Sequence, residues 1–488
     1  MKTIADEIQN FNRLEKSIFN MVMQLGREIF EECLRSLDKE LMSIRDTEKY
    51  RTVNFETTTI KTLLGEINHT RRRYKQKSGG YIFLLDKVLG IEKGCGLVSE
   101  NLAEQIIVEC ADKSFRKASE SISHLAGQRI SAMGAWGVLQ RFGEKLEKQE
   151  KRLGELHRGG VEGQMGKLPR QVVFTEFDDV WLSMQREKRL KKGEQAQTGR
   201  KRIGKKPMHV GTAYSGWSQT QDGKYRLTDK FAYARFGGVN EFTSDFEMLL
   251  SHRFDMDGVK RRVVNGDGAG WIKAAADNDD AMLQLDPFHR SRAITRGVSD
   301  KADRKMLTDA IRDKDVNTAL TIIADLIAKA ADEQSRKKLG NLFSYFHSNK
   351  DTILTWQERG VELPAPPEGI VYRNMGAQES SNCDLLTQRK KHHKGSWSEA
   401  GANNMAKALC FRNTIGIDTI LGILPTSPSP VAATDPLSAA KAPVYDGEGY
   451  DGSWLSATMP FDQVMVTNGR KAIRSILMQR RITDLSMI

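Results

Sequence analysis

The stretch Arg261-Arg262-Val263-Val264-Asn265-Gly266-Asp267-Gly268-Ala269-Gly270-Trp271 joins a strand-like run to a cluster of glycines that holds one carboxylate. Valine-rich runs of this kind are typical of β-strands, and glycines allow the chain to turn sharply where the strand ends. Because glycine has no side chain, a large charged substrate and a metal ion could come close to the Asp267 oxygens. A plain tight turn explains the same residues, so this stretch alone leaves both interpretations open.

A second strand-like segment, residues 172–182, carries Asp178 in its middle. Side chains alternate across a strand, so Glu176 and Asp178 share one face and Asp179 lies on the other. A carboxylate in a core strand is costly unless a group such as a divalent cation compensates it. The alternative is a strand that ends early and leaves Asp178 and Asp179 in solvent.

The order of the predicted elements around these two aspartates favours an RNase H-like core. Residues 208–214 and 225–236 read as two further strands, residues 241–252 as a helix, and the strand that leads to Asp267 follows. In that α/β fold, the order along the chain is three antiparallel strands, a helix and another strand. The first and fourth strands are neighbours in the sheet. Asp178 and Asp267 would then reach one ion.

Composition and charge narrow the class of protein. The 488 residues are too many for one core and carry a formal net charge of +12, which favours an anionic partner, with nucleic acid first. No apolar run approaches 18 residues, so the sequence predicts no membrane span or signal peptide and a cytoplasmic, nucleoid-associated protein. The five scattered cysteines form no zinc pattern and read as reduced thiols.

The N-terminal third is predicted to be a helical and small β DNA-binding region. Residues 1–50 form a helix whose apolar seam could pair with another subunit or pack on its own chain. Residues 51–95 form a small basic β region, and residues 96–155 resemble a helix-turn-helix, with Ser114 and Ser131 as N-caps. A solvated ribbon and a purely structural helical bundle are the alternatives. The DNA-contacting candidates here are Arg71, Arg72, Arg73, Arg116 and Arg129.

Several pieces, taken in order, resemble the DDE transposases of bacterial insertion sequences, in the ISLre-type branch. The likeness covers most of the chain. The pieces are Glu176-Phe177-Asp178-Asp179-Val180-Trp181, Asn265-Gly266-Asp267-Gly268, Leu285-Asp286-Pro287-Phe288-His289, which resembles a C/D-x-x-H signature, Gly376-Ala377-Gln378-Glu379-Ser380-Ser381-Asn382, Arg389-Lys390 and Gly395-Ser396-Trp397-Ser398.

This resemblance implies that Asp178, Asp267 and Glu379 hold two Mg²⁺ or Mn²⁺ ions, with Glu399 as the alternative third carboxylate. Oxygen ligands suit these hard cations, which activate water and neutralise both oxygens of the cleaved phosphodiester. Water would attack at the element end, and the freed 3′-OH would then attack target DNA. His289 would help to position the scissile phosphate; alternatively it is an ordinary histidine at a helix start.

Basic tracts add further candidates for DNA contact. Residues 186–206 read as a loop that could grip phosphates, although charge runs are often simply solvated. A second tract precedes Trp397, which could stack on an unpaired base or pack in the core. The candidates in these tracts are Lys191, Lys192, Arg200, Lys201, Arg202, Arg389 and Lys390.

The predicted organisation is thus an α/β multidomain chain with an RNase H-like mixed sheet and an all-helical insertion. Residues 170–295 and 366–415 form the two parts of the catalytic core, residues 296–365 the insertion, and residues 416–488 a linker and tail. The expected function is transposition, with terminal inverted repeats and target DNA as partners and a homodimer or higher homo-oligomer as the assembly. The alternatives are a structure-specific nuclease or resolvase and a non-catalytic helix-turn-helix regulator.

Overall fold

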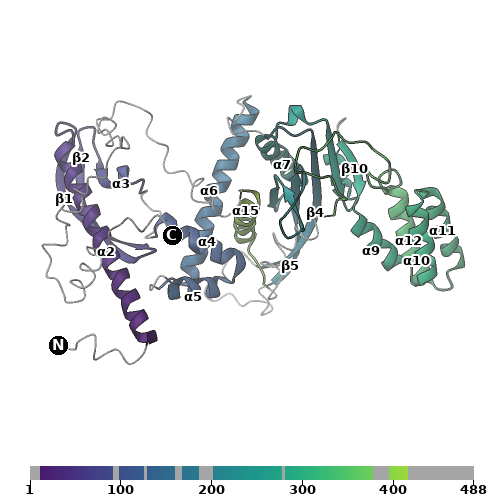
Figure 1. Cartoon of the computed structure of the whole chain (residues 1–488), viewed down its shortest axis with the longest axis horizontal. Helices are drawn as coiled ribbons and strands as arrows, with labels where there is room; N and C mark the ends of the chain where they lie inside the picture. The colour runs from purple at the N-terminus through teal and green to yellow at the C-terminus, as the bar shows by residue number, and fades with distance from the viewer. Residues whose placement is uncertain are drawn as a thin grey trace, which may run out of the picture. The chain divides into compact units, whose positions relative to one another are not determined.

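The computed structural model describes residues 11–91, 98–125, 129–159, 168–185, 202–276, 281–376 and 395–415. These residues divide into two compact units, which are described separately. Within the described part, the first unit contains the residues up to 103 together with 122–129, and the second contains residues 104–121 and those from 130 onward. Figure 1 shows these residues and labels most of their helices and some of their strands.

The first unit packs one long helix on a small antiparallel sheet. Helix α2 (Phe11–Ile44) is followed by β1 (Tyr50–Thr62), β2 (Gly65–Gln76), β3 (Tyr81–Phe83) and the short α3 (Leu84–Val88), and the strands pair in the order β1-β2-β3. Leu34 and Leu41 of α2 are buried against Ile67 and Leu85. Helix α2 therefore packs on its own chain through these two leucines, which are not part of the predicted apolar seam, and what the seam pairs with stays a prediction. Several other apolar residues of α2 stay exposed, namely Phe11, Ile18, Phe19, Val22, Ile29, Phe30, Leu37 and Ile44.

A mixed five-stranded sheet forms the centre of the second unit (Figure 1). Its strands are β4 (Val172–Gln185), β5 (Arg202–Tyr214), β8 (Phe231–Arg235), β9 (Arg261–Gly266) and β10 (Ala281–Leu285), and they lie in the order β10-β9-β4-β5-β8. The β4-β5 and β5-β8 pairs are antiparallel, whereas β4-β9 and β9-β10 are parallel. The first strand of this sheet along the chain is thus the neighbour of the fourth.

The third strand of the sheet is shorter than the sequence predicted, because residues 225–236 do not form one strand. Residues 225–228 are β7 (Tyr225–Thr228), which pairs with β6 (Gly216–Gln219) in a separate two-stranded sheet. The break falls at Asp229, whose backbone takes a φ of 56°. Its side chain accepts hydrogen bonds from Arg170 and Ser215, each at 2.7 Å, and these hold the turn.

The two faces of the sheet are covered by different elements. On one face Phe177 packs on Phe242 and Phe246 of α7 (Val239–Arg253), the helix predicted over residues 241–252. On the other face Phe174 and Val263 are buried with neighbours that include Trp356 and Tyr372. The strands of the site are therefore enclosed from both sides.

Gly211 of β5 marks a point where the sheet and α7 touch without room for a side chain. A Cβ added there would lie 2.5 Å from Phe246 and 2.9 Å from Phe177. Overpacking a core typically costs about 1–3 kcal/mol. We expect Gly211→Ala to lower the free energy of unfolding by about that amount, which thermal or denaturant unfolding would measure. Gly340→Ala, where an added Cβ meets nothing within 4 Å, serves as the control and should not destabilise the chain.

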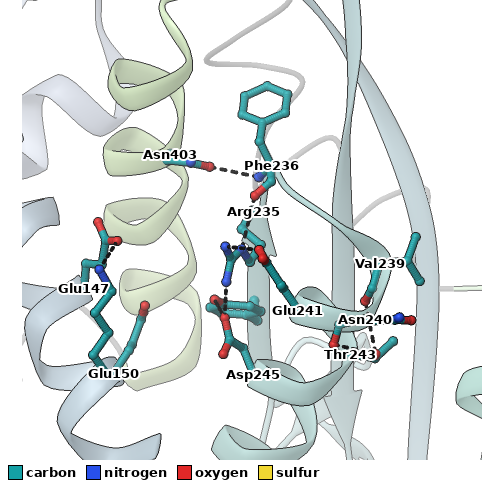
Figure 2. Close-up of polar contacts among 12 residues, drawn as sticks. Glu147, Glu150, Arg235, Phe236, Val239, Asn240, Glu241, Thr243, Asp245 and Asn403 are labelled. Carbon is teal, nitrogen blue, oxygen red and sulfur yellow. Dashed lines mark hydrogen bonds and ion pairs between the residues drawn. The ribbon is translucent and has the colours of Figure 1, made fainter.

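Two helices from distant parts of the chain cover the outer edge of the sheet. Helix α15 (Glu399–Ile415) lies along edge strand β8. The Phe236 N–H donates to Asn403 at 2.9 Å (Figure 2), and the Ala232 N–H donates to Thr414 at 2.9 Å. Helix α6 (Ala132–Arg158) packs on α15 and forms the Glu150–Lys407 ion pair. Unpaired strand edges invite further pairing, and these side chains occupy part of that edge.

Residues 96–155, predicted to resemble a helix-turn-helix, contain three helices, one of them long. They are α4 (Glu100–Asp112), α5 (Phe115–Leu125) and α6, and α6 extends over 27 residues. Ser131 caps α6 by accepting from the Gly134 N–H at 2.9 Å, and Ser114 accepts from the Lys117 N–H at 3.3 Å, so both predicted N-caps are confirmed. Helix α6 is long because its apolar side continues along α15, where Phe142 meets Phe411.

A helical segment with its own core follows β10 (Figure 1). It consists of α9 (Pro287–Gly297), α10 (Lys301–Arg312), α11 (Val316–Lys329) and α12 (Glu333–Ser348). Aspartates 300, 315 and 332 cap the last three helices by accepting backbone N–H groups of the first turn. Two short helical turns, η1 (Met256–Gly258) and α8 (Gly270–Ala275), flank β9. Among the described helices, none combines the length and apolar character that crossing a bilayer requires.

Candidate active site

Asp178 and Asp267 are neighbours in the sheet region. Each comes just after the buried, paired part of two neighbouring parallel strands, β4 and β9. The paired register of β4 and β9 ends with Glu176 opposite Asn265, and each aspartate comes two residues later, Asp178 on β4 and Asp267 in the turn directly after β9. Gly266 stays close to β4, because a Cβ added to it would be 3.5 Å from the Phe177 carbonyl oxygen. Both carboxylates therefore belong to the face that carries Glu176.

Burial raises the pKa of the Asp178 carboxyl from 3.8 to about 6. The negative charges of Asp267 and Asp179 act in the same direction, while the hydrogen bond from the Asp179 N–H at 2.8 Å and the charge of His289 oppose them. Asp179 itself lies on the other face, where its carboxylate is 2.6 Å from Nδ1 of His209. Of the two adjacent aspartates, only Asp178 belongs to the site.

The glycine turn after β9 holds Asp267 in a fixed position. Its Oδ1 accepts from the Ala269 N–H at 2.9 Å, and its main-chain oxygen accepts from the Tyr345 hydroxyl at 2.7 Å. Gly268 has a φ of +87°, and a Cβ added there would meet the Asn349 side chain at 2.7 Å. Glycine is thus required next to the carboxylate both by backbone conformation and by space.

Beneath the two carboxylates, a buried row of polar side chains crosses three strands. Asn265 donates to Glu176 at 3.1 Å, and Gln284 of β10 donates to Asn265 at 3.0 Å. The Tyr214 hydroxyl donates to the other oxygen of Glu176, and Gln284 accepts the Trp356 N–H at 3.0 Å. We call Glu176, Asn265 and Gln284 the polar ladder. It fixes how β4, β9 and β10 align, and hence where Asp178 and Asp267 stand.

The start of α9 brings His289 to the same place. Asp286 follows β10, its N–H donates to the Gly266 carbonyl at 2.8 Å, and its side chain caps α9 by accepting the Phe288 N–H at 3.1 Å. Nε2 of His289 is 3.9 Å from Oδ2 of Asp286. His289 also lines a hollow together with Asp267. The structure therefore groups Asp178, Asp267 and His289.

The third predicted carboxylate, Glu379, lies outside the described residues. The described segment before it, residues 281–376, ends at Gly376, where an added Cβ would be 3.8 Å from Oδ1 of Asp286. Glu399 begins α15 and pairs with Lys206 at 2.7 Å. Lys206 stands opposite Leu182, four residues beyond Asp178 on β4, which is about 13 Å along a strand at roughly 3.3 Å per residue.

The described residues supply two carboxylates, Asp178 and Asp267, as possible ligands of a cation. Among the described residues, no three histidine, cysteine, aspartate or glutamate side chains come together closely enough to hold a metal ion. The two aspartates nevertheless fit Mg²⁺ or Mn²⁺, because their oxygens are ligands that these ions prefer. Burial and mutual repulsion, the two causes that raise the Asp178 pKa, are both relieved by a bound cation.

Asp178 should make folding stability depend on pH in an unusual direction. Because its pKa is raised to about 6 by burial, the folded chain holds a proton between pH 4 and 6 that the unfolded chain has lost, and stability falls as pH rises through that window. Asp178→Asn removes the cost of the buried charge. Without divalent cations, we expect it to stabilise the chain by on the order of 1–3 kcal/mol well above pH 6. Thermal unfolding across pH would show the gain vanishing near pH 4; a gain that does not change with pH would contradict this origin.

The three arginines predicted to contact DNA from the small β region are held by acidic partners of the first unit. Arg71 is buried and donates to Asp86 at 2.8 Å. Arg72 pairs with Asp38, and Arg73 with Glu56 at 3.0 Å. Each guanidinium also lies over an aromatic ring, those of Phe83, Phe55 and Tyr81 respectively. These contacts stabilise the fold, and DNA contact by the three arginines stays a prediction.

The other predicted DNA-contacting residues have varied positions. Arg116 of α5 and Arg129 are exposed. Trp397 meets Phe115 edge-on at 6.3 Å between ring centroids, and its backbone pairs with Ser183 and Gln185 at the end of β4. Arg202 begins β5. Lys191, Lys192, Arg200, Lys201, Arg389 and Lys390 lie outside the described residues.

Comparison with known proteins shows the family. The model of the uncharacterised protein family UPF0236 matches residues 4–420, and the chain belongs to this family. A UPF0236 protein in the vanSb 3′ region of Streptococcus gallolyticus is 23% identical over 81% of this chain and 82% of its own length. A relative from Caldanaerobacter subterraneus subsp. tengcongensis is 23% identical over 83% of this chain and 79% of its own.

Among solved structures, a pre-cleavage Mos1 transpososome matches 51% of this chain and 78% of its own chain, at 10% identity. Its TM-score is 0.14, which is too low to assign a shared fold.

Proposed function

We propose that this chain is a DNA transposase of an insertion sequence, which cuts phosphodiester bonds at the ends of its element and joins the freed 3′-OH ends to target DNA. The observation that carries the proposal is the placement of Asp178 on β4 and of Asp267 directly after β9, the parallel neighbour of β4, close enough for the charge of Asp267 to raise the Asp178 pKa. The sheet order supports an RNase H-like core, because the first and fourth strands are neighbours there as well. The helical segment α9–α12 stands where an insertion between the second and third carboxylates would lie.

The residues of this site would divide the work as follows. Asp178, Asp267 and Glu379 would hold two Mg²⁺ or Mn²⁺ ions, which supply a nucleophile at neutral pH and neutralise charge on the attacking and leaving oxygens. His289 would donate a hydrogen bond to an oxygen of the scissile phosphate. Tyr345 holds the Asp267 backbone, and the polar ladder keeps the two strands aligned while DNA binds.

The name of one relative supports a mobile gene. The Caldanaerobacter protein carries eleven joined designations. This is expected if the same protein is encoded at several places in one genome, as insertion sequences are. We infer that the present chain has DNA as its partner, namely the terminal repeats of its own element and the target DNA.

One incubation tests the proposal. The purified chain is mixed with Mn²⁺, labelled DNA from both flanks of its gene, and an unlabelled target plasmid. A transposase yields labelled ends joined to the plasmid. Cut ends without joining would indicate a structure-specific nuclease or resolvase, and binding without cutting would indicate a regulator; either result would overturn transposition.

Metal binding can be examined without DNA. Mn²⁺ should raise the unfolding temperature of the wild-type chain, because a ligand that binds only the folded state stabilises it. Asp178→Asn and Asp267→Asn should each reduce this gain. An equal gain in all three proteins would place the bound Mn²⁺ elsewhere.

A further inference from the structure

A hollow of about 430 Å³ lies between α9 and α12 and reaches the candidate site. Asp267, His289 and Tyr345 line it together with three cationic side chains, those of Arg292, Arg296 and Lys338. None of the three cations was singled out from the sequence. Asn341 adds an amide to the same wall.

The three cationic side chains lie at increasing distances along α9 and α12 from the residues of the candidate site. Arg292 and Arg296 come one and two turns after His289 on α9, and Lys338 comes two turns before Tyr345 on α12. Two turns of helix are about 11 Å. The helices are packed closely, since a Cβ added to Gly297 would meet Leu342 at 2.9 Å. The positive groups thus line the hollow from Asp267 outward. The distance that they cover is longer than the spacing between neighbouring phosphates of a DNA strand.

Within the described part of the chain these side chains have only weak partners: Arg292 lies over the Phe288 ring at 5.8 Å, and the charge of Lys338 is among the causes that lower the pKa of Asp332. No described carboxylate forms an ion pair with Arg292, Arg296 or Lys338. Arg290, on another side of α9, differs, because it is paired with Glu358 at 2.9 Å. Three cations that surround a concave surface and form no ion pair with a described carboxylate favour an anionic ligand, although Asp267 lines one end of the hollow.

We infer that this hollow binds the phosphate groups of a DNA strand next to the bond that is cut. The inference rests on the proposed function and names the part of the substrate that the helical segment would bind. Arg292 and Arg296 would each donate to phosphate oxygens through their guanidinium groups, and Lys338 would contribute a point charge. Contacts of this kind position the strand without reading its sequence.

The test measures binding of the full chain to a fluorescein-labelled DNA duplex in EDTA, so that no cleavage is needed. The triple variant Arg292→Gln, Arg296→Gln, Lys338→Gln is compared with Lys301→Gln, Lys305→Gln, Lys337→Gln. All six positions are exposed, and the second variant removes the same charge from residues of the same helical segment that do not line the hollow. Affinity is followed between about 50 and 200 mM salt, where each phosphate contact adds about 0.9 to the slope of log K against log salt.

The hollow variant should lose about 2–3 in this slope and bind at least about tenfold more weakly, while the control variant keeps the wild-type slope. An unchanged slope in the hollow variant, or an equal loss in both variants, would overturn the inference. Saturable binding of inorganic phosphate or a mononucleotide that DNA does not displace would also overturn it, since the occupant would then be a small anion. If the triple variant unfolds, the single variants Arg296→Gln and Lys338→Gln should each lower the slope by about 0.9.

This outcome is separable from the fate of the proposed function. If DNA is never cut yet the hollow variant loses its slope, the hollow binds DNA in a protein that is not a transposase. If wild-type cleavage is observed and the slope is unchanged, the proposed function stands without this contact.

Discussion

Asp267→Asn should abolish both cutting and joining of DNA while DNA affinity stays within a few-fold of the wild type. Asp267 is held by the glycine turn beside Asp178, and an asparagine keeps its size and its hydrogen bond to the Ala269 N–H but loses the charge that a divalent cation needs. Cation chemistry supplies several kcal/mol to phosphodiester cleavage. Its loss corresponds to a rate decrease of about 10³-fold or more, measured as cleavage of labelled element ends in Mn²⁺.

Asp257→Asn provides the matched control, because Asp257 is an exposed aspartate in the turn just before β9. Its cleavage rate should equal that of the wild type. An Asp267→Asn protein that cuts within tenfold of the wild-type rate would remove Asp267 from the reaction, and a large loss of DNA affinity would indicate that the variant disturbs more than chemistry.

Glu379→Gln should also lose about 10³-fold in cleavage, whereas Glu399→Gln should lose at most a few-fold. The described segment 281–376 ends three residues before Glu379, at Gly376, where an added Cβ would be 3.8 Å from Oδ1 of Asp286. Glu399 is paired with Lys206 at the level of Leu182. Partly exposed ion pairs contribute little to stability, about 0–1 kcal/mol, so Glu399→Gln should also fold normally.

The pair of variants decides between the two candidates for the third carboxylate in a single assay with the same labelled ends. If Glu399→Gln is the inactive protein and Glu379→Gln retains activity, the assignment is reversed while the roles of Asp178 and Asp267 remain. If both variants keep wild-type rates, the site has no third carboxylate from this part of the chain.

The local sequence pattern was enough to predict the strand face on which Asp178 lies and the residues that cap two helices. Alternation along β4 separates Asp178 from Asp179, and the structure places Asp179 against His209 on the opposite face. Ser114 and Ser131 were recognisable as caps, because capping depends only on residues three apart. Predictions of this kind need no knowledge of distant contacts.

Contacts between distant segments account for what the sequence did not reveal. Arg71-Arg72-Arg73 reads as a free basic patch, but the acidic partner of Arg72, Asp38, lies on a helix 34 residues earlier. The polar ladder likewise joins three strands. One signal was present, since Glu176, Asn265 and Gln284 each stand two residues before an aspartate. It becomes meaningful only when the strands are known to be neighbours.

The hollow was hidden for the same reason. Arg292 and Arg296 are separated from Lys338 by two intervening helices, and in the sequence all three are ordinary members of a basic chain. Only the packing of α9 on α12 gathers them beside Asp267.

The polar ladder has a consequence for how mutations elsewhere in the molecule should act. A slip of β9 by one residue against β4 would turn Asp267 to the opposite side and leave Glu176 buried without Asn265. No partly aligned arrangement gives the residues of the polar ladder their hydrogen bonds. In each molecule, therefore, Asp178 and Asp267 either lie together or are separated. Destabilising substitutions remote from the aspartates should therefore reduce the number of competent molecules in a preparation, while those that remain competent turn over at the normal speed.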